Sequence, residues 1–115
     1  MPELADLQAL ARLALELDER EPIANAVRES LDWFSNQNPG RAVELRVPPF
    51  RVVQVLGGTT HRRGTPPAIV EMSPQGWLRL LTRQTTWDAE IANGSIQASG
   101  ERSNLGEVIA ETLSN

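Results

Sequence analysis

Apolar residues recur every three or four positions in the first third of the chain. The apolar positions of the first stretch are Leu4, Leu7, Leu10, Ala11, Ala14 and Leu17. Their spacing predicts an amphipathic helix over residues 3–17. After the charged break DEREP, Pro22 suits the first turn of a second helix, 22–36, because its missing N–H costs nothing there. The apolar face of this second helix comprises Ile23, Ala26, Val27, Leu31 and Phe34.

From residue 42 the apolar period changes to two. In AVELRV, Val43, Leu45 and Val47 are separated by Glu44 and Arg46, which predicts a strand over 42–47 with one wet face. A Pro-Pro turn follows, and FRVVQVL predicts a second strand over 50–56. We expect that strand to be central because it is more apolar. AIVEM, 68–72, and SIQAS, 95–99, predict a third and a fourth strand.

Capping residues mark three further helices in the second half. Ser73 before Pro74 predicts the start of a helix over 74–82, and Thr86 predicts the cap of a helix over 87–93. Ser103 or Asn104 caps a last helix over 104–113. The order ααβββααβα predicts an α+β domain, with a small, mostly antiparallel sheet covered by helices.

Length and composition limit what such a domain can be. The 115 residues suit one domain, in which 1–37 form the helical pair and 38–115 the sheet with the C-terminal helices. The start of the chain is acidic, unlike a secretory signal, and no apolar run is long enough for a membrane span, so we expect no stable membrane insertion. The absence of cysteine fits a cytoplasmic protein, which we expect. The net charge is −4 and every basic residue is arginine. An acidic domain without a basic stripe is a poor candidate for binding nucleic acid.

The segment GGTTHRRGTPP, 57–67, joins the second and third predicted strands. It is not a phosphate-binding loop of the Walker type, because five residues separate Gly58 from Gly64, lysine is absent and a strand follows. Arg62 and Arg63 leave two interpretations open. They recognise an anionic group, together with the neighbouring His61, or they are solvent-facing charges on a connector.

We expect neither catalytic residues nor a metal site. A single histidine and no cysteine leave only carboxylates as further ligands, and no nucleophile–base pattern is present. The acidic cluster between the first two helices is most simply a solvated corner, formed by Glu16, Asp18, Glu19 and Glu21. No cofactor is expected.

The second half of the chain also has a familiar order of elements. AIVEMSPQGWLRLLTRQTTWDAEIANGSIQASGERSNLGEVI, 68–109, resembles the C-terminal half of the sterol-carrier-protein-like (type 2) fold. GRAVELRVPPFRVVQ and HRRGTPPAIVE resemble the bacterial sterol carrier orthologue domain, in its short actinobacterial branch. The resemblance covers roughly 39–109. The chain departs from the family in the link TRQTTW, where Arg83 stands in place of a glycine, and its shorter first half implies a smaller cavity.

The resemblance implies a hydrophobic tunnel between sheet and helices, closed by the C-terminal helix. Candidate lipid-binding residues are Trp77, Leu80, Leu81, Ile91, Ile96, Val108, Ile109 and Leu113. His61, Arg62 and Arg63 are candidates for a head group. The favoured function is non-enzymatic binding of a fatty-acyl or sterol-like lipid. The alternative is an accessory or interaction domain with a filled core, like those appended to mycothiol-dependent isomerase-type enzymes. The sequence leaves the oligomeric state open.

Overall fold

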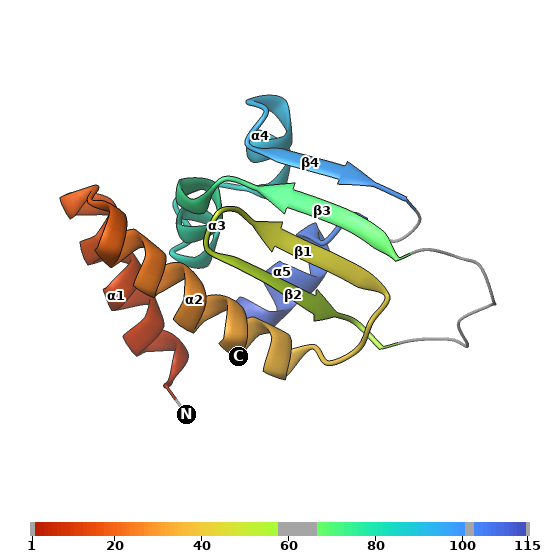
Figure 1. Cartoon of the computed structure of the whole chain (residues 1–115), viewed down its shortest axis with the longest axis horizontal. Helices are drawn as coiled ribbons and strands as arrows, with labels where there is room; N and C mark the ends of the chain where they lie inside the picture. The colour runs from red at the N-terminus through yellow and green to blue at the C-terminus, as the bar shows by residue number, and fades with distance from the viewer. Residues whose placement is uncertain (1, 58–66, 101–102, 115) are drawn as a thin grey trace.

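A computed structural model describes residues 2–57, 67–100 and 103–114 and contains every predicted element (Figure 1). The helices are α1 (Leu4–Leu17), α2 (Arg20–Gln37), α3 (Pro74–Leu81), α4 (Trp87–Ala92) and α5 (Gly106–Leu113). The strands are β1 (Val43–Val47), β2 (Arg51–Val55), β3 (Ala68–Met72) and β4 (Ile96–Ser99). In the described part of the chain, no helix is long and apolar enough to cross a membrane.

The four strands form one mixed sheet in the order β2-β1-β3-β4. Two neighbouring pairs, β1 with β2 and β3 with β4, are antiparallel, while β1 and β3 run parallel. The predicted α+β class with a mostly antiparallel sheet is therefore confirmed. The expectation that 50–56 is central was wrong. β2 lies at the edge, and its Val52 is 54% exposed, because β1 pairs with β3 on its other side.

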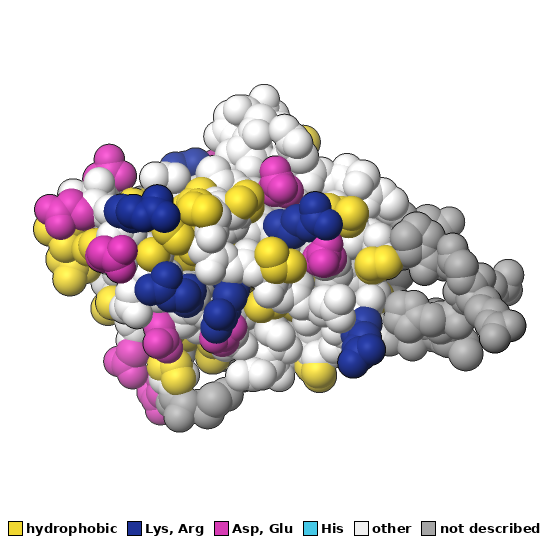
Figure 2. Space-filling view, viewed as in Figure 1, with side chains coloured by type: hydrophobic (Ala, Val, Ile, Leu, Met, Phe, Trp, Pro, Cys, Tyr) yellow, Lys and Arg dark blue, Asp and Glu magenta, His cyan; other side chains and the backbone are white. Residues whose placement is uncertain are grey.

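One face of the sheet is covered by helices and the other faces solvent. Val43, Leu45 and Val47 of β1 are buried, and the β3 partners of the first two, Ala68 and Val70, share that inner face. α5 runs behind β1 and β2 in Figure 1, and its Ile109 and Leu113 belong to the same buried cluster. The outer face, seen in Figure 2, mixes charged and apolar side chains. The side of β1 that was predicted to face solvent lies in the middle of that outer face.

Two helices start two residues away from the predicted position, and the other helix boundaries agree to within one residue. α2 begins at Arg20, so that Pro22 lies inside its first turn and not at its start. The connection between α1 and α2 can be short because Asp18 takes a left-handed conformation, φ +50°, which turns the chain. The Asp18 N–H donates to the carbonyl of Ala14 and so ends α1. α5 begins at Gly106, two residues after the predicted start, while Asn104 still supplies a side-chain acceptor to it.

Candidate functional site

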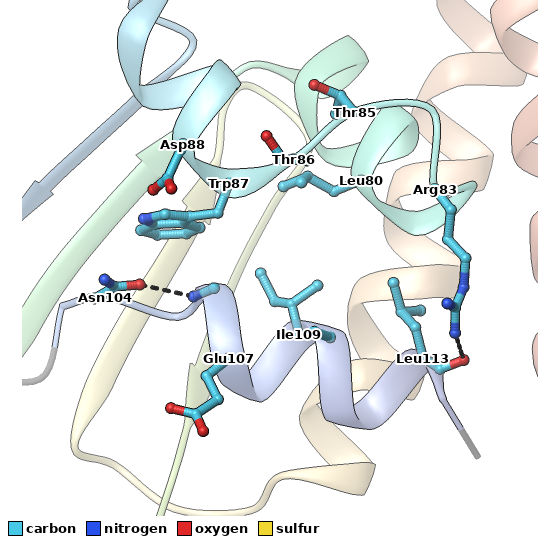
Figure 3. Close-up of a pocket in the computed structure, with 12 residues that line it drawn as sticks. Leu80, Arg83, Thr85, Thr86, Trp87, Asp88, Asn104, Glu107, Ile109 and Leu113 are labelled. Carbon is cyan, nitrogen blue, oxygen red and sulfur yellow. Dashed lines mark hydrogen bonds between the residues drawn. The ribbon is translucent and has the colours of Figure 1, made fainter.

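A groove of about 530 Å³ lies between α5, the link 82–86 that follows α3, and the start of α4 (Figure 3). This volume falls within the usual range of small-molecule sites, about 300–1,000 Å³. Its apolar floor is formed by Leu80, Ile109 and Leu113, which are all buried. Its remaining lining residues are Arg83, Thr85, Thr86, Trp87, Asp88, Asn104, Gly106, Glu107 and Ala110. The groove is thus an apolar floor with a polar rim.

The wall formed by α4 is fixed by a buried carboxylate. The Glu90 side chain is 3% exposed, and its Oε1 accepts a hydrogen bond of 2.6 Å from the guanidinium of Arg79 on α3. Its Oε2 accepts from the Thr85 hydroxyl at 2.8 Å. Burial acts to raise the pKa of Glu90, but the hydrogen bonds from Arg79, Thr85 and Ser95 outweigh it and hold the pKa below its ordinary value. The link and α4 are therefore anchored to α3 through one charged group.

A glycine lets α3 approach the start of β4. A Cβ at Gly76 would lie 2.1 Å from the Ser95 hydroxyl oxygen, a distance that no real side chain tolerates. The Ser73 hydroxyl caps α3 by accepting from the Gly76 N–H at 3.0 Å, as its sequence position predicted, and also lies 3.0 Å from the Ser95 hydroxyl. α3, which carries Leu80, is thus held in place at its N-terminus as well.

Arg83 closes one end of the groove. Its backbone is left-handed, φ +59°, a conformation that glycine adopts at no steric cost and arginine does not. Its guanidinium donates a hydrogen bond to the carbonyl oxygen of Leu113 in the last turn of α5 (Figure 3). A cation is favoured there by the helix dipole. The departure from the family's glycine is therefore a strained residue whose side chain ties the link to α5.

Trp87 closes the other end. It is half-buried in the first turn of α4, which the Thr86 hydroxyl caps as predicted by accepting from the Ala89 N–H at 3.1 Å. A Cβ at Gly106 would lie 3.0 Å from the Cγ of Trp87, so the absence of a side chain there lets the indole rest against α5. Asn104 accepts a hydrogen bond of 2.9 Å from the Gly106 N–H and fixes the first turn of α5 below the indole (Figure 3).

Comparison with known proteins decides the family. A model of the family described as "Bacterial SCP ortholog", where SCP is sterol carrier protein, matches residues 19–110. The chain belongs to that family. Among solved structures it is similar to sterol carrier protein-2 like-3 from Aedes aegypti, with 13% identity and a TM-score of 0.44, over 77% of this chain and 98% of that chain. No curated protein matches the sequence.

In this member of the SCP family, the residues proposed for lipid binding fall into three groups. Leu80, Ile109 and Leu113 line the groove. Trp77, Leu81 and Ile96 are buried in the hydrophobic cluster between helices and sheet, and Val108 packs against that cluster. Ile91 is 40% exposed on α4. The three groove residues lie on the apolar helix faces that the periodicity of the sequence identified. Periodicity alone could not distinguish residues that line a groove from residues of the core.

Trp77, one of the candidate lipid-binding residues, belongs to the packed core. Trp77, the largest fully buried side chain, occupies the space between α3 and α2, where its ring meets Phe34 edge-on at 5.4 Å. The Trp77 Nε1 donates to the Ser30 hydroxyl at 2.8 Å. Side chains thus fill that layer, and the groove opens beside α5. Trp87, Arg83 and Asn104 were not predicted as lining residues, because the pairing of link and α5 is a tertiary contact.

The structure leaves the polar candidates untested. His61, Arg62 and Arg63 lie outside the described residues, so the head-group hypothesis for 57–67 stays a prediction. Within the ranges 2–57, 67–100 and 103–114, no three His, Asp or Glu side chains are grouped so that they could hold a metal ion.

Proposed function

We propose that this SCP-family domain binds a single-chain apolar lipid, of fatty-acyl type, in the groove beside α5, without chemical turnover. The observation that carries this is the groove itself, an open space of about 530 Å³ whose floor of Leu80, Ile109 and Leu113 continues into the hydrophobic core. Membership of the sterol carrier protein family supports an apolar ligand. The rim of hydroxyl and charged groups leaves the polar end of such a ligand in contact with water.

Chain length gives a first test of apolar binding. Each methylene removed from water contributes about 0.8 kcal/mol, which corresponds to an affinity increase of about three- to fourfold. We expect the Kd of linear primary alcohols to fall by about that factor per carbon from octan-1-ol to decan-1-ol. An affinity that does not depend on chain length would contradict burial of the chain.

A pair of variants on one helix locates the site. Ala110 is exposed and lines the groove, whereas its neighbour Glu111 is exposed and does not belong to the lining. Ala110→Trp places a large ring in the groove, and we expect it to weaken decan-1-ol binding by about tenfold or more. Glu111→Trp adds the same ring to the same helix and should leave affinity within about twofold of the parent. Equal affinity in both variants would place the site elsewhere.

The second candidate, an accessory domain with a filled core, is favoured by a specific observation. Trp77, Leu81 and Ile96, three of the candidate lipid-binding residues, leave at most 3% of their surface exposed and belong to the hydrophobic cluster. Native mass spectrometry of the purified protein distinguishes the two candidates. A co-purified lipid that Ala110→Trp removes supports the carrier, and a clean protein mass together with no affinity for decan-1-ol supports the packed domain.

A further inference from the structure

The charge of the groove points to the head group of its ligand. Its lining includes two carboxylates, Asp88 and Glu107, and one cation, Arg83. Arg83 lies at the far end from Trp87 and is already bonded to the Leu113 carbonyl (Figure 3). The two helices that form the walls, α4 and α5, contain no basic residue along their described lengths, but four acidic ones, Asp88, Glu90, Glu107 and Glu111. Glu90 is paired with Arg79, and Glu111 lies outside the lining, so the charge at the Trp87 end of the groove comes from Asp88, with Glu107 nearby on α5.

Resting on the proposed function, we propose that this end binds a positively charged ammonium head group. Figure 3 shows the Asp88 carboxylate directed toward the Trp87 indole, so that a ring face and an anion adjoin the same space. A quaternary ammonium is attracted both by the quadrupole of tryptophan and by a neighbouring carboxylate. A carboxylate or phosphate head at this end would instead meet the like charge of Asp88, and the one cation of the described lining, Arg83, lies at the other end of the groove.

The charge of Glu107 attracts the ammonium group from a distance and not by direct contact. Its side chain projects away from Ile109 in Figure 3, on the opposite side of α5 from the groove floor. Both Glu107 and Asp88 lie in the first turn of a helix, where the dipole supplies about half a positive charge to each. Two full negative charges therefore remain only partly offset.

Three ten-carbon probes with one chain and different heads test the proposal. Calorimetry at neutral pH and low ionic strength, below micelle formation, compares decyltrimethylammonium, decan-1-ol and decanoate. We expect the ammonium to bind about tenfold more tightly than decanoate, with the alcohol between them. Added salt should reduce that difference. Tetramethylammonium, which has the head but no chain, should bind at least about tenfold more weakly than decyltrimethylammonium.

Substitutions at Asp88 and Trp87 test whether these residues cause the preference for an ammonium head group. Asp88→Asn should lower the affinity for decyltrimethylammonium about fivefold and leave that for decan-1-ol within about twofold. Trp87→Leu keeps an apolar body but loses the ring, so it should lower ammonium affinity more than alcohol affinity. Glu111→Gln removes one charge from α5 outside the groove lining and serves as the matched control, with affinity for the ammonium changed by less than about twofold.

The outcomes separate the two proposals. If none of the three ten-carbon probes binds, the proposed function fails and this inference fails with it. If decan-1-ol binds but decanoate binds as tightly as the ammonium, the head-group inference is overturned and lipid binding stands. If tetramethylammonium binds as tightly as decyltrimethylammonium, the groove recognises a free ammonium compound and the chain-binding proposal is overturned.

Discussion

The indole of Trp87 rests on Gly106, so that no side chain of α5 separates it from the first turn of that helix. A Cβ at Gly106 would lie 3.0 Å from the Cγ of Trp87 and 3.1 Å from the side-chain oxygen of Asn104. Both residues line the groove, and they come from segments on either side of β4. Their contact therefore sets how closely the two walls approach at this end.

Gly106→Ala should separate these walls. Overpacking by one methyl group costs about 1–3 kcal/mol, while alanine is favoured over glycine in a helix by up to about 1 kcal/mol. We expect a net loss of stability of about 1 kcal/mol in urea unfolding and an altered near-ultraviolet circular dichroism from the moved indole. Unchanged stability together with an unchanged aromatic spectrum would show that Trp87 does not rest on Gly106.

Two substitutions at Arg83 separate the effect of its backbone strain on stability from the effect of its side-chain hydrogen bond. Arg83→Ala loses the hydrogen bond to Leu113 and keeps the left-handed backbone, whereas Arg83→Gly loses the same bond and relieves the strain. We expect the glycine variant to be more stable than the alanine variant by about 1 kcal/mol. Hydrogen exchange in the last turn of α5 should be faster in both variants than in the parent. If alanine and glycine are equally tolerated, the left-handed conformation at this position is wrong.

Trp77 is predicted to be the main aromatic support of the core. It is 1% exposed, and Trp77→Ala should cost about 3–5 kcal/mol in chemical unfolding, because a large cavity opens between α2 and α3. Trp87→Ala is the matched control. Because Trp87 is only half-buried, its loss should cost clearly less. A similar loss of stability in the two variants would contradict the assignment of Trp77 to the core and of Trp87 to the groove.

Glu90 should make stability depend on pH in acid. Because its pKa is lowered in the folded state, its contribution is fully present above its unfolded value of 4.5 and is lost as pH falls through the lower folded value. Glu90→Gln should cost about 1.5–3 kcal/mol at neutral pH, the range for a hydrogen bond to a charged group. Its unfolding free energy should also fall less steeply than that of the parent below about pH 5. Parallel pH profiles for the two proteins would contradict the role assigned to Glu90.

Local patterns account for what the sequence could predict. Ser73 and Thr86 both cap helices where the sequence placed them, because an N-cap requires only a side-chain acceptor three residues before the N–H that it bonds. The edge position of β2 was missed, because FRVVQVL is apolar on its inner face and also carries Val52 outward. Strand order depends on which strand β1 pairs with on its other side, and that pairing is not local.

The groove could be predicted only in part for the same reason. Leu80, Ile109 and Leu113 were identified from helical periodicity, which finds apolar faces without showing what covers them. The missing glycine at Arg83 was visible in the sequence, but its bond to Leu113 spans 30 positions. Trp87 has one apolar partner at helical spacing, Ile91, but that side chain is 40% exposed, so the place of Trp87 at the end of the groove depends on Gly106, which lies beyond β4.

Intermolecular nuclear Overhauser effects can show whether a lipid chain binds between α5 and the link 82–86. With decan-1-ol bound to methyl-labelled protein, we expect contacts from the chain to the methyl groups of Leu80, Ile109 and Leu113, and none to Val43 or Leu45 in the filled core. Contacts confined to other methyl groups, such as Val52 and Ile69 on the outer face of the sheet, would contradict it.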